Sequence, residues 1–170
     1  PGYYCIPLVY GNGIKNNRWN TKAYQSSQPA GTPYLLKTFK DHRDGDIVNP
    51  WIGQQQGGGP DDTKTIWMDQ PNLVRSSSLQ IVHSPDYLEF EVKKEDIRNG
   101  NAVIAVIRGG EVAWSWHLWF IHDDALNTVT CTNFQGHEYK FTQETLGWKY
   151  TAWSASTYSA PRSVKVKVRQ

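Results

Sequence analysis

Aromatic side chains outside the hydrophobic core are the groups in this sequence best suited to binding a ligand. A flat aromatic face packs against the apolar C–H face of a pyranose ring, so an exposed tryptophan can bind carbohydrate. The chain of 170 residues has eight tryptophans, of which five are candidate ligand-binding residues: Trp19, Trp51, Trp119, Trp148 and Trp153. All but Trp119 lie in or near polar loop sequence, as do Tyr24 and Tyr158, and loops carry binding residues more often than core strands do. The alternative is that several of these rings close the ends of a hydrophobic core.

A dense aromatic run, Trp114-Ser115-Trp116-His117-Leu118-Trp119-Phe120, has a second interpretation. Period-two alternation places five large apolar residues on one face, namely Val112, Trp114, Trp116, Leu118 and Phe120. The other face carries Ala113, Ser115, His117, Trp119 and Ile121. The first face could form a platform for sugar rings, but it is too hydrophobic to be left open to water. We therefore expect Trp114 and Trp116 to belong to the core.

Metal-ligating residue types occur, but their spacing matches no familiar site. His117 with His122 and Asp123 could approach a metal, although a histidine between tryptophans is more often a partly buried, hydrogen-bonded polar group. The aspartates 41, 44 and 46 could bind calcium, but they lack the spacing of the helical calcium loop, and a solvated turn is the simpler interpretation. The sequence predicts neither a metal nor another cofactor.

Catalytic motifs are also missing. The sequence contains no G-x-S-x-G elbow, no H-E-x-x-H and no phosphate-binding loop. Gly11-Asn12-Gly13 lacks the third glycine and the following helix of a dinucleotide site. A pair of carboxylates could still act on a glycosidic bond, but nothing singles out two of them. We expect a protein that is not an enzyme, with no catalytic residues.

Short strands separated by turns must position these side chains. The best-supported element is a hairpin in which residues 101–107, apolar on both faces, are joined by Gly109-Gly110 to a returning strand at 112–121. Residues 87–92 alternate cleanly, with Leu88, Phe90 and Val92 on one face and Tyr87, Glu89 and Glu91 on the other. The other strand candidates are residues 3–10, 34–39, 65–68, 78–83, 128–132, 137–141, 146–150 and 163–169. Residues 53–63 predict an exposed loop and residues 93–97 a single helical turn.

This pattern predicts an all-β fold, an antiparallel β-sandwich with long polar loops, formed by residues 1–170 as a single domain.

With 18 basic and 16 acidic residues, the net charge is +2, and the basic residues are scattered, so we expect no nucleic-acid partner. No apolar run is long enough for membrane insertion by this domain. Because the chain begins in strand-like sequence, it is interpreted as an excised domain or mature fragment of a longer protein. Cys5 and Cys131 are either disulfide-bonded or two buried thiols.

One string of residues resembles a known family. Residues 100–106 (GNAVIAV), followed by a turn and Trp114-Ser115-Trp116-His117-Leu118-Trp119, are similar to a signature of surface proteins of Bacteroidales, the fimbrillin-like and pilus-tip-like lipoproteins. Residues 1–4, 7–12, 66–69 and 146–148 resemble further parts of the same domain in the same order, so the resemblance spans most of the chain. The Trp-Ser-Trp-His string is specific, whereas the other pieces are individually weak. Neither cysteine belongs to the family pattern.

The resemblance implies a β-sandwich, export across the inner membrane, and an extracellular location on the outer membrane surface or on a pilus. It implies pilus or other surface subunits as partners and brings no catalytic residues. Some members of the family polymerise by strand exchange, and residues 163–169 could be exchanged in that way or could form an ordinary edge strand. The first functional hypothesis is therefore a structural or adhesive fimbrial component. The second is a carbohydrate-binding module for host or dietary glycans, which two or three coplanar exposed rings would favour and burial of all eight tryptophans would contradict.

Overall fold

The protein is all-β, as the sequence predicts. The structure, a computed structural model, describes residues 1–26, 37–82 and 87–148. Its strands are β1 (Gly2–Pro7), β2 (Ile14–Lys15), β3 (Arg18–Trp19), β4 (Asp62–Met68), β5 (Gln80–Val82), β6 (Tyr87–Val92), β7 (Gly100–Arg108), β8 (Glu111–Phe120), β9 (Thr128–Thr132) and β10 (Glu138–Thr142). Short 3-10 helices are η1 (Thr21–Ala23), η2 (Ile52–Gln54), η3 (Ser76–Ser78), η4 (Lys94–Asp96) and η5 (Asp123–Leu126). None of the helices in these ranges has the length and hydrophobicity needed to cross a lipid bilayer.

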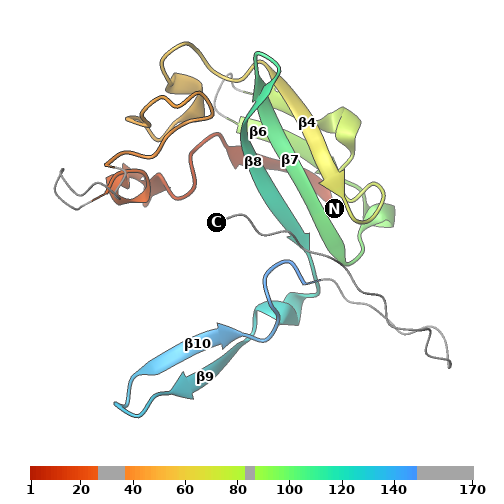
Figure 1. Ribbon diagram of the computed structural model, residues 1–170. Helices are drawn as coiled ribbons and strands as arrows, with labels where there is room; N and C mark the ends of the chain where they lie inside the picture. The colour runs from red at the N-terminus through yellow and green to blue at the C-terminus, as the bar shows by residue number, and fades with distance from the viewer. Residues whose placement is uncertain (27–36, 83–86, 149–170) are drawn as a thin grey trace, which may run out of the picture.

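The strands form two three-stranded antiparallel sheets and two isolated hairpins (Figure 1). One sheet has the order β4-β7-β8 and the other the order β1-β6-β5, and the core lies between them. The hairpin β2–β3 follows β1, and the hairpin β9–β10 extends away from both sheets (Figure 1). The result is a small sandwich with antiparallel sheets that do not close on each other.

The predicted hairpin forms as β7 and β8, and β7 is the central strand of its sheet. Gly109 and Gly110 have φ angles of 57° and 85°, in the left-handed region that glycine adopts without steric cost. Strand β7 is buried along nearly its whole length, because strands cover both of its edges and the opposing sheet covers one face. Trp116 pairs with Ile104, and Leu118 pairs with Ala102, so these side chains share the core face.

A β-bulge changes the face on which two residues of β8 lie. The register shifts between Val106 and Ile107, which pair with Trp114 and Val112, and leaves Ala113 as the extra residue. Ala113 is consequently buried, at 4% exposure, whereas Val112 is 44% exposed. The prediction that strict alternation holds along the whole strand is wrong at these two positions. Beyond the bulge it holds, and Trp114, Trp116, Leu118 and Phe120 pack against the core as expected.

The opposing sheet follows the predicted alternation without interruption. Leu88, Phe90 and Val92 of β6 are all buried and form much of the facing layer of the core. Among the described residues, β1 and β8 are edge strands, each paired on one side only. A hollow of about 440 Å³ lies between their edges and is lined mainly by apolar residues: Tyr4, Phe90, Val92, Ile97, His117, Leu118, Trp119, Phe120 and Ile121.

Three further expectations are not met. The described part of 146–150 is a turn and not a strand, with the Trp148 N–H donating to the Thr145 oxygen at 2.8 Å. Cys5 and Cys131 are free and exposed, so they are neither bonded to each other nor buried. The hairpin β2–β3 lies between residues 11 and 33, where no strand was predicted. The strand predicted at 163–169 and the first half of that at 34–39 lie outside the described residues.

Candidate functional site

Two of the predicted tryptophans come together in one hollow. Trp19 and Trp51 line an open pocket of about 490 Å³ together with Tyr87. Trp19 is 55% exposed, and the other two rings are half-buried. The remaining wall consists of Pro7, Val9, Gly11, Ile14 and Asn17. We call this hollow the aromatic pocket, and it is the site in the described part of the chain that best suits a ligand with flat apolar faces.

A tight hairpin places Trp19 at the pocket. Asn16 and Asn17 join β2 to β3 with φ angles of 51° and 58°, the left-handed values of a two-residue hairpin turn that asparagine tolerates. Trp19 pairs directly with Ile14, so both side chains lie on the same face of the hairpin and toward the pocket. At Gly13 a Cβ would lie 2.7 Å from the Pro50 Cβ, so the hairpin packs against the loop that carries Trp51 only because this residue has no side chain.

Backbone hydrogen bonds on both sides hold Trp51. The Ile52 N–H donates to the Leu8 oxygen at 2.8 Å, and the Tyr10 N–H donates to the Pro50 oxygen at 2.9 Å, so the loop pairs with the chain just after β1. The buried Gln55 amide donates to the oxygens of Asn49 and Trp51 at 2.6 and 2.7 Å. Because a buried amide that lost these acceptors would be costly, this loop has one preferred conformation.

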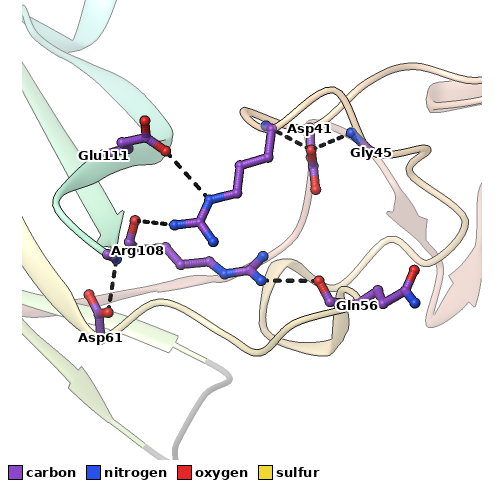
Figure 2. Close-up of polar contacts among 8 residues, drawn as sticks. Asp41, Gly45, Gln56, Asp61, Arg108 and Glu111 are labelled. Atoms are coloured by element: carbon purple, nitrogen blue, oxygen red, sulfur yellow. Dashed lines mark hydrogen bonds and ion pairs between the residues drawn. The ribbon is translucent and has the colours of Figure 1, made fainter.

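Charged residues attach the same loop to the β7–β8 turn (Figure 2). Arg108 is only 8% exposed, and its guanidinium donates to the Gln56 oxygen at 3.0 Å. The Gly109 N–H donates to the Asp61 carboxylate at 2.9 Å, on the other side of the turn. The Arg43 side chain donates to the Arg108 oxygen at 3.2 Å and pairs with Glu111 at 3.4 Å. These contacts connect the aromatic pocket to the central hairpin.

The aspartate-rich turn takes part in this attachment. Oδ1 of Asp41 accepts the N–H groups of Arg43 and Gly45, both at 2.8 Å. Burial by itself would raise the pKa of Asp41, but these two hydrogen bonds and the nearby charges, including Arg108, lower it overall. Burial, together with the negative charge of Asp41, raises the pKa of Tyr10 to about 12, against an opposing effect of Arg108. The turn is therefore a structural element that orients Arg43.

The other two described candidates, Trp119 and Trp148, also meet, at a different place. The Trp119 indole N–H donates to the Trp148 oxygen at 2.7 Å, so its polar edge is already occupied. Trp148 is 51% exposed, and Trp119 is half-buried. These two residues do not line the aromatic pocket, so the predicted tryptophans form two separate groups.

His117 is a hydrogen-bonded polar group beside this second group. The Asn101 amide donates to Asp69 at 3.0 Å and to the Gly147 oxygen at 3.1 Å, which leaves its own oxygen to accept from Nε2 of His117 at 2.7 Å. The ring of Trp67 lies 6.4 Å from the His117 ring. No group of three potential metal ligands occurs within the described ranges, and the proposed approach of His122 and Asp123 to His117 does not produce one.

Sequence reasoning did not select Tyr87 or Trp67 as candidates, and it misplaced Tyr24. Tyr87 lines the aromatic pocket, and its outward position in the alternation of residues 87–92 was the available signal. Trp67 is 47% exposed and lies in the strand predicted at 65–68. Tyr24, expected in a loop, is 1% exposed and belongs to the core. Trp153 and Tyr158 lie outside the described residues.

Comparison of the chain with protein-family models, curated proteins and solved structures finds no match.

Proposed function

We propose that this chain is a non-catalytic adhesive domain of a cell surface and that it binds carbohydrate through the aromatic pocket. The observation that carries the proposal is the convergence of Trp19, Trp51 and Tyr87 from three distant segments on one open hollow. Rings of this kind offer a large apolar contact to a sugar face at a low cost in side-chain entropy. Host or dietary glycans are the expected ligands.

The rigidity of the pocket supports binding. The Ile52 N–H donates to the Leu8 oxygen, and the Gln55 side-chain amide donates to the Trp51 oxygen. Trp19 lies on a hairpin with a two-residue turn. A ligand that enters a pre-formed pocket does not have to order the protein. Less of the interaction energy is then spent on the loss of conformational entropy, so the affinity is higher. The site therefore suits recognition of a ligand whose contacts are individually weak.

The composition of the pocket wall favours binding over hydrolysis. Neither a carboxylate nor a histidine is among the described residues that line it. Glycoside hydrolysis in most enzymes needs two carboxyl groups on either side of the scissile bond. The proposal is accordingly a carbohydrate-binding domain, and the adhesive role follows from that binding.

Titration of the whole chain with a panel of oligosaccharides, followed by tryptophan fluorescence and calorimetry, tests this function. We expect saturable binding of one glycan class, weakened about tenfold or more by Trp51→Ala and by Trp19→Ala. Trp148→Ala is the matched control, because this exposed tryptophan lies outside the pocket, and it should bind as the parent does. The proposal fails if no glycan binds, or if Trp148→Ala abolishes binding while the pocket variants do not.

A second candidate function, a structural subunit of a surface fibre, has its own supporting observation. The edges of β1 and β8 are unpaired among the described residues, and the hollow between them is mainly apolar. A strand from another subunit could pair with such an edge and fill the hollow. Sedimentation of the chain at increasing concentration should then show association, which Phe120→Glu should reduce. A monomer at every concentration would argue against self-association.

A further inference from the structure

The hairpin that carries Trp19 also holds two positive charges in an unfavourable arrangement. Lys15 and Arg18 are directly opposite each other in the β2–β3 ladder, and both are exposed. Like charges at directly opposed positions repel and destabilise a strand pair. A two-residue ladder has little other pairing energy, so the repulsion is significant for this hairpin.

Neither charge is neutralised within the described part of the chain. The arginines at 43, 75, 98 and 108 each donate to a carboxylate or to a backbone oxygen. Arg18 is the only described arginine without such an acceptor, and Lys15 takes part in none of the described ion pairs. The hairpin therefore presents two free cations, one of them a guanidinium suited to a planar anion.

These cations border a second hollow that shares a wall with the aromatic pocket. The second hollow has a volume of about 500 Å³ and is lined by Lys15, Asn16, Arg18, Trp19 and Asn20. We call it the basic hollow. Trp19 lines both hollows, so the two hollows meet at this side chain. None of the described residues in either wall is acidic, so nothing in the walls offsets the positive charge.

We propose that the glycan bound at the aromatic pocket is an acidic oligosaccharide, with a carboxylate or sulfate group held by Lys15 and Arg18. This inference rests on the proposed carbohydrate-binding function and names its ligand class. One sugar ring stacks in the aromatic pocket, and the anion of the same or the next residue lies over the basic hollow. The anion removes the repulsion between the two cations, which the free protein must tolerate.

Matched ligand pairs test the inference. Oligogalacturonate is compared with its methyl ester for the carboxylate, and a sulfated glycan oligosaccharide with its desulfated form for the sulfate. We expect the acidic member of one pair to bind about tenfold more tightly at low ionic strength. Added salt should narrow the difference, because exposed charges are screened over about 10 Å at 0.1 M ionic strength.

Charge removal at the hairpin supplies the second arm. Arg18→Gln and Lys15→Gln should lower the affinity for the acidic ligand to nearly that for the neutral one and leave neutral binding unchanged. Lys64→Gln, at an exposed lysine of β4 outside both hollows, is the matched control. Because removing either charge relieves repulsion, the midpoint of thermal unfolding should stay the same or rise, which separates lost binding from lost folding.

Each outcome bears on one of the two proposals. Equal binding of acidic and neutral partners, or unchanged acidic binding in Arg18→Gln, overturns the acidic-ligand inference and leaves carbohydrate binding intact. If no oligosaccharide of either kind binds, both proposals are wrong. If acidic ligands bind but Trp19→Ala has no effect, the cations act as a general anion site, and the shared role of the two hollows is rejected.

Discussion

Two groups of tryptophans in this molecule lie in different environments, one against the core and one in an open pocket. Trp114 and Trp116 of β8 pack against the core between the sheets, whereas Trp19 and Trp51 line an open pocket beside them. The difference comes from the element that carries each ring. A ten-residue strand facing a second sheet must bury one of its faces, whereas a two-residue strand and a loop have no opposing layer to cover them. The core rings serve stability, and the pocket rings are available for binding.

The core tryptophans and the pocket tryptophans are connected through Tyr10 and Pro50. The ring of Tyr10 packs edge-on against Trp114, with centroids 5.1 Å apart. The Tyr10 N–H also donates to the Pro50 oxygen, next to Trp51. The pocket is therefore supported by the core without being part of it. Substitutions should separate the two roles, and the predictions below are ordered by the size of the expected effect.

The largest effect is expected from truncation of a core tryptophan. Trp116→Ala removes a large ring packed on the core and should lower the free energy of unfolding by about 3 kcal/mol. Trp19→Ala, at a ring 55% exposed, should change it by less than about 0.5 kcal/mol. Urea-induced unfolding of both variants measures the difference. Similar losses in the two variants would show that the rings do not have separate roles.

A smaller effect is expected where the loop is attached to the central hairpin. Arg108→Ala removes a charged donor to the Gln56 oxygen and should cost about 2 kcal/mol of stability. It should also weaken glycan binding, because the loop that carries Trp51 loses an attachment to β7. Arg98→Ala breaks an exposed pair with Asp96 and should cost less than about 0.5 kcal/mol. Unfolding and binding assays on both variants give the comparison, and an unchanged affinity in Arg108→Ala would mean that the loop does not depend on this contact.

The stability of the protein should fall at low pH in part because Asp41, in the turn that orients Arg43, becomes protonated. The pKa of this carboxyl is lowered in the folded protein, so its contribution to stability is present above the unfolded-state pKa and is lost as pH falls through the folded-state value. Asp41→Asn keeps an oxygen acceptor for the two N–H groups but does not titrate. Stability measured between pH 7 and pH 2 should therefore decline less steeply below about pH 4 in the variant than in the parent. Parallel declines would show that Asp41 makes no such contribution.

The smallest effect concerns the hairpin turn alone. Asn16 has a φ angle of 51°, which glycine adopts at lower cost. Asn16→Gly should therefore raise the free energy of unfolding by a few tenths of a kcal/mol. Because the path of the chain is unchanged, Trp19 should keep its position and the affinity for a neutral glycan should not change. Thermal unfolding and calorimetry check both points. A large loss of affinity would show that Trp19 depends on the turn residue itself and not on its backbone conformation.

Strand-level predictions were accurate where local pattern decides the outcome. The alternation of Leu88, Phe90 and Val92 and the Gly109-Gly110 turn appear in the structure as expected. Prediction was wrong at Val112 and Ala113, where a bulge inserts one residue into the ladder. Alternation in one strand shows which residues are apolar, but it does not show where the strand carries an extra residue relative to its partner, so the bulge could not be predicted from the sequence of β8 alone.

For the candidate site, the residue types were predictable and their grouping was not. Tryptophans in polar sequence could be identified as candidates because a large ring with polar neighbours has no local reason to be buried. That Trp19 and Trp51 meet each other and Tyr87, while Trp119 meets Trp148, was decided by contacts between distant segments. Contacts between segments also decided that Cys5 and Cys131 are exposed and unbonded, because Cys5 lies in β1 beside β6 and Cys131 lies in β9 beside β10.

The sequence by itself determined the all-β class, the β7–β8 hairpin and the core face of β6, because these follow from short-range periodicity and turn chemistry. The tertiary structure alone decided that the hairpin β2–β3 packs against the loop at Pro50, that Arg108 holds this loop, and that the cations of Lys15 and Arg18 border the ring of Trp19. The physical reason is that such pairings depend on the energy of the whole packed arrangement, to which each segment contributes only one side.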